Sequence, residues 1–323
     1  MKKFVGIDLG TGNTFIYVNG RGIIFSEPTV VAIDTKTGHV NEIGYFASKM
    51  LGRVPVNIDV IKPIQRGVPA RMNPTILYLK EALKRNKIKS LKGYELLFSV
   101  PSDITPVEKN ALKAIGEALS AKTIIFENQA KLASIGSGIQ FKNNRGTLHV
   151  NIGSGTSNII VMSGEQILVS KSSMFCGNII DDAILRYLRK QRHLLIGSKT
   201  AEFIKMKIGS VEFTPENRLL EVSGRDILTS LPHNVNISTN EIKSILTPLV
   251  EILVDAINAA LIITPPELAS DIHENGIVLS GGTALLAGLR EYIEKKINIP
   301  VRLAPDPVAS VANGMQNYIK THR

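Results

Sequence analysis

Tryptophan is absent from the 323-residue chain, and aromatic residues make up only 5% of it. A surface of stacked aromatic rings for bases or sugars is therefore not expected. The single cysteine, Cys176, excludes an internal disulfide and a multi-cysteine metal site, and it is typical of proteins from a reducing compartment such as the cytosol. His193, His233 and His273 lack the spacing of metal ligands and are expected at the surface.

Long apolar runs and low-complexity linkers are also missing. No apolar run approaches the roughly 20 residues that a membrane-spanning helix needs, so none is expected. Residues 1–5 lead directly into a strand pattern, without a signal-peptide core or an amphipathic helix in front. With 44% apolar and 20% charged residues, the chain can bury a sizeable core, and its length suits two domains that interlock.

The formal net charge of +10 is unevenly distributed. Residues 62–95 carry a net charge of +7 and residues 186–207 a net charge of +6, so two short segments exceed the whole excess. Such patches favour an anionic partner, either lipid or nucleic acid. Two solvated helix faces would give the same pattern, and both interpretations stay open.

An internal repeat is the most informative feature. Residues 6–18 and 150–161 each combine an apolar strand, a turn of Gly, Thr, Ser and Asn, and a second apolar strand. The two copies are offset by 143 residues, nearly half the chain. Asp8 aligns with Asn151, Gly10 with Gly153, Thr11 with Ser154, and Gly12 with Gly155. The repeat predicts an α/β chain of two similar halves, each opening with a hairpin.

The chemistry of these turns suits phosphate. Glycine lets backbone N–H groups approach an anion closely, and hydroxyl groups add donors. A Walker loop is not indicated, because its G-x-x-x-x-G-K-[ST] pattern is missing and a strand follows the turn where a helix would be needed. Two ordinary tight hairpins are the alternative, which the matched spacing disfavours. The candidate hydroxyl donors are Thr11, Thr14, Ser154 and Thr156.

Other elements are expected from local patterns. Thr105, Pro106 and Glu108 form a capping box with proline at the first helical position, ahead of an apolar helix face. Further expectations are a type I′ turn at Asn19-Gly20, a strand over 94–100, helices over 180–195 and 241–262, and a strand over 277–279 followed by a glycine turn.

Two such hairpins resemble the ATP grip of the actin/Hsp70/sugar-kinase superfamily, and within it the chain is similar to the MreB family of bacterial actins. The resemblance covers essentially the whole chain. It rests on motifs that include IDLGTGNT (7–14), VPSDITPVEK (100–109), NIGSGTSN (151–158), LLIGSKTAEFIKMKIGS (194–210) and GIVLSGGTALLAGL (276–289).

The resemblance implies an actin-like, ribonuclease H-like duplicated α/β fold, with two lobes around a nucleotide cleft and four subdomains. The implied bounds are 1–33, 62–145 and 313–323 for the inner subdomain of lobe I, 34–61 for its outer subdomain, 146–180 and 240–312 for the inner subdomain of lobe II, and 181–239 for its outer subdomain.

The resemblance also implies the residues that bind ATP or ADP with Mg²⁺. Gly12, Asn13 and Thr14 are expected at the β- and γ-phosphates, and Ser154, Gly155 and Thr156 opposite them. Glu202 and Lys205 are expected at the ribose and base, although a surface ion pair between them is the alternative. Asp8 is expected to face the metal through water. The loop expected against the adenosine is Gly281, Gly282, Thr283 and Ala284, with Thr283 in place of a usual third glycine.

Several residues depart from the family's pattern, and every departure except Ala130 and Cys176, which replace a proline and a glycine, removes negative charge. Gln129 replaces the glutamate thought to orient the attacking water, and Asn151 replaces an aspartate. With Asp8 these are the candidate catalytic residues, so at most a slow ATPase is expected. A divergent relative with compensating changes is the alternative. The remaining departures are Asn128, Ala130, Asn178, Arg71 and Cys176.

The function implied by the resemblance is that of an ATP-binding cytoskeletal protein. It would polymerise with itself into filaments at the inner membrane surface, remain cytoplasmic and peripheral, and help determine cell shape. Related filament proteins and cell-shape membrane proteins are further candidate partners, and direct nucleic acid binding is not expected. A loop over 72–77 and nearby bases are the candidate membrane contact. The alternatives are a sugar kinase, disfavoured by the lost acids, and a plasmid-segregating filament.

Overall fold

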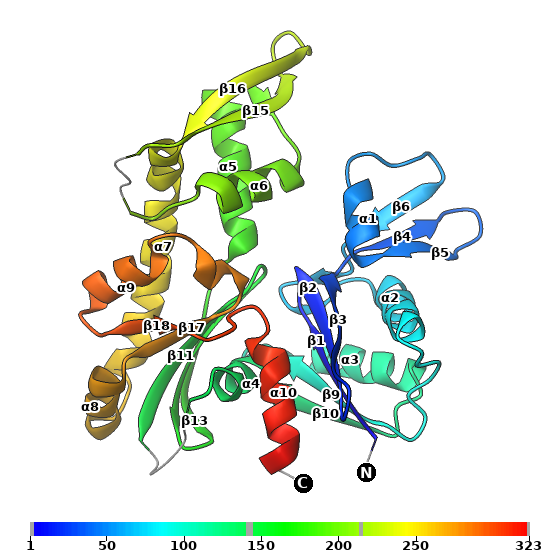
Figure 1. The fold of residues 1–323 in the computed structure, drawn as a ribbon, viewed down its shortest axis with the longest axis vertical. Helices are drawn as coiled ribbons and strands as arrows, with labels where there is room; N and C mark the ends of the chain where they lie inside the picture. The colour runs from blue at the N-terminus through cyan, green and yellow to red at the C-terminus, as the bar shows by residue number, and fades with distance from the viewer. Residues whose placement is uncertain (1–2, 140–144, 213–215, 322–323) are drawn as a thin grey trace. The chain divides into compact units, whose positions relative to one another are not determined.

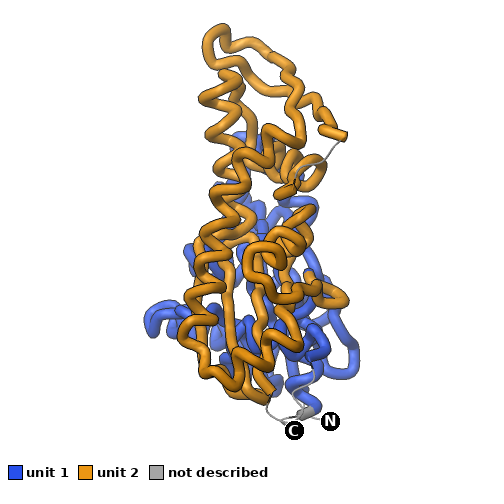
Figure 2. The backbone as a smooth tube through the Cα atoms, turned by 90° about the vertical axis from the view of Figure 1, so that its left-hand side faces the viewer, with its two compact units in different colours: residues 1–140, 308–323 blue, residues 141–307 orange. Residues whose placement is uncertain are grey.

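The structure is a computed structural model, and it describes residues 3–139, 145–212 and 216–321 (Figure 1). The chain forms two compact units, residues 1–140 with 308–323 (unit 1) and residues 141–307 (unit 2), which Figure 2 colours separately. The chain leaves unit 1, forms the whole of unit 2 and returns, as the expectation of interlocked domains requires. The four subdomain bounds stay predictions.

Unit 1 is built on a mixed five-stranded sheet. The strand β1 is parallel to β9 and antiparallel to β2. In spatial order the strands are β10 (Thr123–Asn128), β9 (Glu95–Val100), β1 (Phe4–Leu9), β2 (Asn13–Val18) and β3 (Gly22–Pro28). A smaller sheet has the order β5 (Val40–Ile43), β4 (Val31–Asp34), β6 (Ile58–Ile61), and β7 (Ile64–Gln65) and β8 (Val68–Pro69) form a short hairpin.

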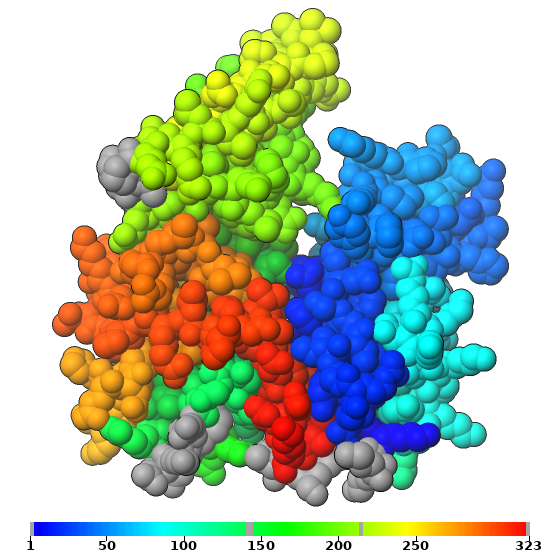
Figure 3. All heavy atoms as spheres, viewed as in Figure 1, coloured from blue at the N-terminus to red at the C-terminus, as the bar shows by residue number. Residues whose placement is uncertain are grey.

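Helices cover both faces of the larger sheet in unit 1. The helices α2 (Met72–Arg85) and α3 (Pro106–Ala118) share one apolar core with alternate residues of β1. The helices α4 (Gln129–Gly136) and α10 (Ser310–Thr321) share a second core that contains Phe4. Figure 3 shows the red C-terminal helix beside the blue N-terminal strands, and a Cβ on Gly6 would lie 2.5 Å from the Sδ of Met315. Unit 1 also contains the helix α1 (Gly44–Met50).

Unit 2 repeats the sheet arrangement of unit 1. Its central strand β11 is antiparallel to β12 and parallel to β17, as β1 is to β2 and β9. In spatial order the strands are β13 (Gln166–Ser173), β12 (Ser157–Ser163), β11 (Gly146–Ile152), β17 (Ile277–Ser280) and β18 (Val301–Leu303). The matching strand orders confirm the two similar halves that the sequence repeat predicts.

The other elements of unit 2 are helices and a second sheet. The helices are α5 (Gly177–Gln191), α6 (Ser198–Ile208), α7 (Thr239–Ile262), α8 (Pro266–Asn275), α9 (Leu289–Ile297) and the 3₁₀ turn η2 (Gly282–Leu285). The second sheet has the order β14 (Leu194–Leu195), β15 (Leu219–Asp226), β16 (Pro232–Ser238).

The helix α7 corrects the expectation that no segment is long and apolar enough to span a membrane. Its 24 residues include an 18-residue window of mean hydropathy 1.9, and it is the one such helix within the described ranges. A stripe that includes Ile242, Leu246, Val250 and Ile257 is buried in the core of unit 2, as expected of the core helix of a globular unit. Isolated charges such as Asp255 interrupt the apolar run in the sequence.

The local expectations are mostly confirmed. The Thr105 capping box, the helix that follows it, the strand at 95–100 and the long helix from 239 are all present. The expected type I′ turn is wrong, because Val18 pairs with Gly22 and leaves a three-residue loop. The expected helix over 180–195 ends at Gln191, since His193 has a φ of +50° and Leu194 joins β14 in the core.

Candidate functional site

The turn of the first hairpin is held by hydrogen bonds within unit 1. The N–H of Gly10 donates to the carbonyl of Asn13 over 3.1 Å. Thr29 donates its hydroxyl proton to the carbonyl of Gly10 (2.7 Å), so in the 2.8 Å contact between the Thr14 and Thr29 hydroxyls Thr14 is the donor. The fully buried Thr14 therefore supports the turn from inside, and the half-buried Thr11 and Gly12 and the exposed Asn13 form its accessible part.

Three neighbouring parallel strands bring their carboxyl ends together beside this turn. Asp8 near the end of β1 accepts a 2.5 Å hydrogen bond from the hydroxyl of Ser99 in β9. It also accepts a 2.8 Å bond from the Nε2 of Gln129, which follows β10. This edge of a parallel sheet is where α/β proteins bind ligands. Two of the candidate catalytic residues, Asp8 and Gln129, are thus in direct contact.

Asp8 is a buried carboxyl group with two hydrogen-bond donors. Burial raises the pKa of its carboxyl above the ordinary value, and the hydrogen bonds from Ser99 and Gln129 lower it in part. Both donors bind Oδ1, which leaves Oδ2 for a water molecule of a hydrated Mg²⁺. Mg²⁺ commonly keeps most of its waters and takes one or two carboxylates with substrate phosphates. In the described part of the chain, no group of three or more His, Cys, Asp or Glu residues could hold a metal directly.

The turn of the second hairpin has the same backbone geometry in unit 2. The N–H of Gly153 donates to the carbonyl of Thr156 over 2.9 Å. Ser157, which corresponds to Thr14, is fully buried and donates its hydroxyl proton to the carbonyl of Phe175. Asn151 is buried where Asp8 stands in the first copy, and its Oδ1 accepts a 3.0 Å bond from the hydroxyl of Ser280.

Two neighbouring segments clamp the second turn. The N–H groups of Gly177 and Asn178, at the start of α5, donate to the carbonyls of Gly153 (3.1 Å) and Ser154 (2.8 Å). Thr283 donates its hydroxyl proton to the carbonyl of Gly153 over 2.9 Å. These bonds bring the start of α5, the turn and η2 into one cluster.

The loop at 281–284 tolerates Thr283 in place of a third glycine. The residue that needs glycine is Gly281, which has a φ of +85° and whose added Cβ would lie 2.2 Å from the carbonyl oxygen of Ile152. Thr283 is not among the residues with positive φ. Gly282 is exposed, and Ala284 is buried in the core.

Lys205 joins the same cluster through a partner that sequence reasoning missed. Its Nζ lies 2.8 Å from the Oδ1 of Asp181 and donates to the carbonyl of Gly177 over 3.3 Å. The surface ion pair between Lys205 and Glu202 is therefore not formed, and Glu202 stays exposed on α6. The sequence signal for this contact is the i, i+4 spacing of Gly177 and Asp181, which puts both partners of Lys205 on one face of α5.

A family model described as MreB/Mbl protein matches residues 2–323. The chain belongs to the MreB/Mbl protein family. It is 38% identical to the cell shape-determining protein Mbl of Bacillus cereus over 311 residues, which cover 96% of this chain and 93% of that protein. The predicted family is confirmed.

Solved structures of MreB5 of Spiroplasma citri match across 100% of this chain and 97% of theirs. The structure bound to ADP has 34% sequence identity and a TM-score of 0.94, and the one bound to AMPPNP has 35% and 0.95. The MamK double helical filament, at 19% identity, has a TM-score of 0.85 over 98% of both chains and shares the fold. The actin-like α/β fold, and with it the prediction of a cytoskeletal actin homologue, is confirmed.

The departures from the MreB/Mbl pattern have structural roles of their own. Asn128 caps α4 by accepting a 3.1 Å bond from the N–H of Lys131, and its amide donates to the hydroxyl of Ser102. Arg71 forms an exposed ion pair with Asp59 at 3.7 Å. The side chain of Asn178 is exposed. The other two, Ala130 and Cys176, are buried, and burial raises the pKa of the Cys176 thiol.

The expected loop conformation at 72–77 is wrong, because these residues form the first turns of α2, and their contact with a membrane stays a prediction. Pro74 is tolerated there, since the first turn needs no intrahelical donor. Ile76 packs against the core of unit 1, whereas Met72 is 37% exposed. The expected exposure of His193, His233 and His273 is confirmed.

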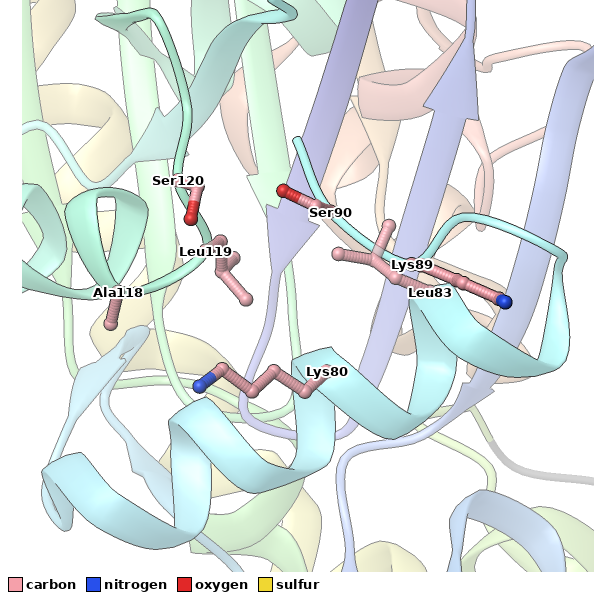
Figure 4. A pocket seen from close by; sticks show the side chains of 7 residues that line it. All are labelled: Lys80, Leu83, Lys89, Ser90, Ala118, Leu119 and Ser120. Carbon is pink, nitrogen blue, oxygen red and sulfur yellow. The ribbon is translucent and has the colours of Figure 1, made fainter. Parts of the chain in front are cut away.

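The basic segment 62–95 instead borders a cavity of about 190 Å³ in unit 1. Lys80 and Lys89 form no ion pair with any described residue, whereas Lys84 and Arg85 both pair with Glu81. In Figure 4 the hydroxyls of Ser90 and Ser120 and the side chain of Lys80 approach a common space. The lining residues are Lys80, Leu83, Lys89, Ser90, Ala118, Leu119 and Ser120.

Proposed function

We propose that the protein binds ATP and ADP with Mg²⁺ and polymerises into filaments that lie at the inner membrane surface and help determine cell shape. The observation that carries this proposal is the pair of matched phosphate-type turns, closed by Gly10 and Gly153, in a chain of the MreB/Mbl family. It is supported by the cell-shape names of relatives and by ADP and AMPPNP in the structures of a relative.

The nucleotide would use both turns. We infer that Thr11, Gly12 and Asn13 in unit 1 and Ser154–Thr156 in unit 2 receive the phosphates through backbone N–H groups. Lys205 and Glu202 would contact the ribose and base, and the loop 281–284 would contact the adenosine. Asp8 would accept a hydrogen bond from a water of the bound Mg²⁺. A nucleotide that binds the native state must raise its stability. Thermal unfolding with ADP or AMPPNP, with and without Mg²⁺, tests this, and no shift in any condition would contradict it.

Hydrolysis would be slow at best. A catalytic carboxylate can take a proton from the attacking water, but the amide of Gln129 is a poor proton acceptor and already donates to Asp8. Asn151 supplies no charge to balance the metal. We therefore infer an ATP-binding filament protein with, at most, a slow ATPase.

Polymerisation is supported by exposed apolar residues on the second sheet of unit 2. Leu228 and Leu231 are 77% and 63% exposed beside a turn that Asp226 holds through bonds of 2.8 and 2.7 Å. A preformed apolar tip suits a heterologous head-to-tail contact, which generates open filaments. Leu228→Lys should reduce pelleting of polymer, whereas Leu168→Lys, at an exposed leucine in β13, should not. Equal pelleting of all three proteins would contradict this role.

Membrane association is supported by Lys80 and Lys89 at the 190 Å³ cavity, which form no ion pair with any described residue. Each surface lysine adds about 1 kcal/mol of attraction to an anionic membrane. Lys80→Ala with Lys89→Ala should therefore reduce binding to phosphatidylglycerol vesicles more than Lys84→Ala, whose lysine is already paired. Binding of the first variant equal to wild type would contradict this surface. Association with related filament proteins or cell-shape membrane proteins stays a prediction.

A further inference from the structure

A strained arginine lies at the tip of the short β7–β8 hairpin in unit 1. Gln65 pairs with Val68, so the loop consists of Arg66 and Gly67 alone. Both have positive φ, +50° and +76°, as a type I′ turn requires. Asparagine, aspartate or glycine usually fills the first position, since the left-handed conformation costs other residues about 1–2 kcal/mol. An arginine kept there at this cost suggests a role for its side chain.

The hairpin tip is tied to the first phosphate-type turn. The N–H of Gly67 donates to the Oγ1 of Thr11 over 2.8 Å. Thr11 lies between β1 and β2, directly before Gly12. Arg66 is therefore one residue from a hydrogen bond to the accessible part of this turn.

The same arginine is also close to the helix that follows β9. Hydrogen bonds from Thr105 lower the pKa of the Glu108 carboxyl, and the charge of Arg66 adds to this effect. Glu108 is engaged in its capping box, since its Oε2 accepts from the N–H and the hydroxyl of Thr105, both at 2.8 Å. Arg66 forms no ion pair with any residue in the described ranges. Arg66 is thus exposed and unpaired among the described residues, in a hairpin that is hydrogen-bonded to the turn after β1.

We propose that Arg66 recognises the terminal phosphate of a bound nucleoside triphosphate and so distinguishes ATP from ADP. A guanidinium presents a planar fork of donors that matches phosphate oxygens, and its charge does not depend on pH. The two-residue turn already fixes the backbone, so only the freedom of the side chain is lost when Arg66 binds phosphate. This inference rests on the proposed nucleotide binding and adds the residue that senses the third phosphate.

The test uses Arg66→Asn in the full chain, because asparagine suits the turn while removing the cation. Titrations with ADP and with AMPPNP, both with Mg²⁺, give two dissociation constants. The AMPPNP affinity should fall about tenfold or more, as expected for a lost bond to a charged group, and the ADP affinity should stay within about twofold. Thermal unfolding without nucleotide should show no loss of stability.

Two matched variants complete the experiment. Arg66→Lys keeps the charge and should recover part of the AMPPNP affinity, and Arg71→Asn removes the arginine paired with Asp59 and should leave the ratio unchanged. An unchanged ratio in Arg66→Asn, or equal losses for both nucleotides, would overturn the inference. A wild-type protein that binds neither nucleotide would instead overturn the proposed function, and this inference with it.

Discussion

The two hairpin turns have the same backbone geometry but differ in the charge of a nearby side chain. In both, a glycine N–H closes the turn onto the carbonyl three residues later, at 3.1 Å from Gly10 and 2.9 Å from Gly153. The residue two positions before the first glycine of each turn differs. Asp8 is a buried carboxylate that accepts two hydrogen bonds, and Asn151 is a buried amide that accepts one. The geometry of the turn therefore does not require the acid.

The two turns are also supported by different neighbours. Thr29 and Gly67 contact the first turn, and Gly177 and Thr283 contact the second. The hydroxyl that follows each turn, on Thr14 or Ser157, is buried and bonded within its own unit. The glycines and the backbone N–H groups are therefore what the two copies of the repeat have in common.

A carboxylate introduced into either turn gives the largest expected effect. Gly155→Asp should weaken ADP binding about a hundredfold or more, because a fixed negative charge would face the phosphates at short range. Gly12→Asp is the matched change in unit 1 and should weaken ADP binding to a similar extent. Isothermal titration measures both, and Gly12→Ala and Gly155→Ala are the controls for side-chain volume. A turn whose variant binds ADP normally is not a phosphate site.

Restoring the two family acids should sharpen the difference between binding and hydrolysis. Gln129→Glu with Asn151→Asp should raise the rate of phosphate release about 10- to 100-fold, and more than either change alone, because in the proposed function both residues would act on one water and one metal shell. Single-turnover phosphate release measures this. Arg71→Asp is the control in this series and should leave the rate unchanged, because Arg71 pairs with Asp59. Rapid release by the wild type would contradict the premise.

Removing the charge of Asp8 should make the first turn resemble the second. Asp8→Asn should raise the free energy of unfolding by about 1–3 kcal/mol near neutral pH, since a buried charge is costly, and weaken the Mg²⁺-dependent part of nucleotide binding. Because the pKa of Asp8 is raised in the folded state, the native protein binds more protons than the unfolded one above pH 3.8. The stability of the wild-type protein therefore falls as pH rises from about 3.8 to the folded-state pKa of Asp8.

The variant lacks this titration, so its advantage should grow from about pH 4 and level off above the folded-state pKa of Asp8. Urea unfolding of both proteins between pH 4 and 8 measures the difference. An advantage that shrinks as pH rises would contradict the assignment of a buried, costly carboxylate at position 8.

The smallest effects are expected from the buried hydroxyls. Thr14→Ala and Ser157→Ala should each lower the free energy of unfolding by about 1 kcal/mol, the usual worth of one buried hydrogen bond. Nucleotide affinity should change by no more than a few-fold, since both hydroxyls bond within their units. A tenfold loss of ADP affinity in Thr14→Ala alone would show that this hydroxyl contacts phosphate.

Much of the fold and part of the site could be predicted from local patterns. The capping box of Thr105 and the strand at 95–100 depend on neighbours in sequence, so the sequence indicates them directly. The prediction of a loop at 72–77 was wrong, because Ile76 packs against the core of unit 1 and the local sequence pattern does not show that contact. Asp181, Thr29 and Gly67 were missed, because their partners lie 15 or more residues away.

The sequence by itself determined the duplicated hairpins, the glycines at their turns, the loss of family acids and membership of the MreB/Mbl family. These features lie in spacing and residue type, which need no coordinates. Only the tertiary structure decided that Gln129 bonds to Asp8, that Lys205 pairs with Asp181, and that the Arg66 turn is tied to Thr11. The physical reason is that hydrogen bonds and ion pairs act over a few ångströms, and folding alone decides which distant residues come that close.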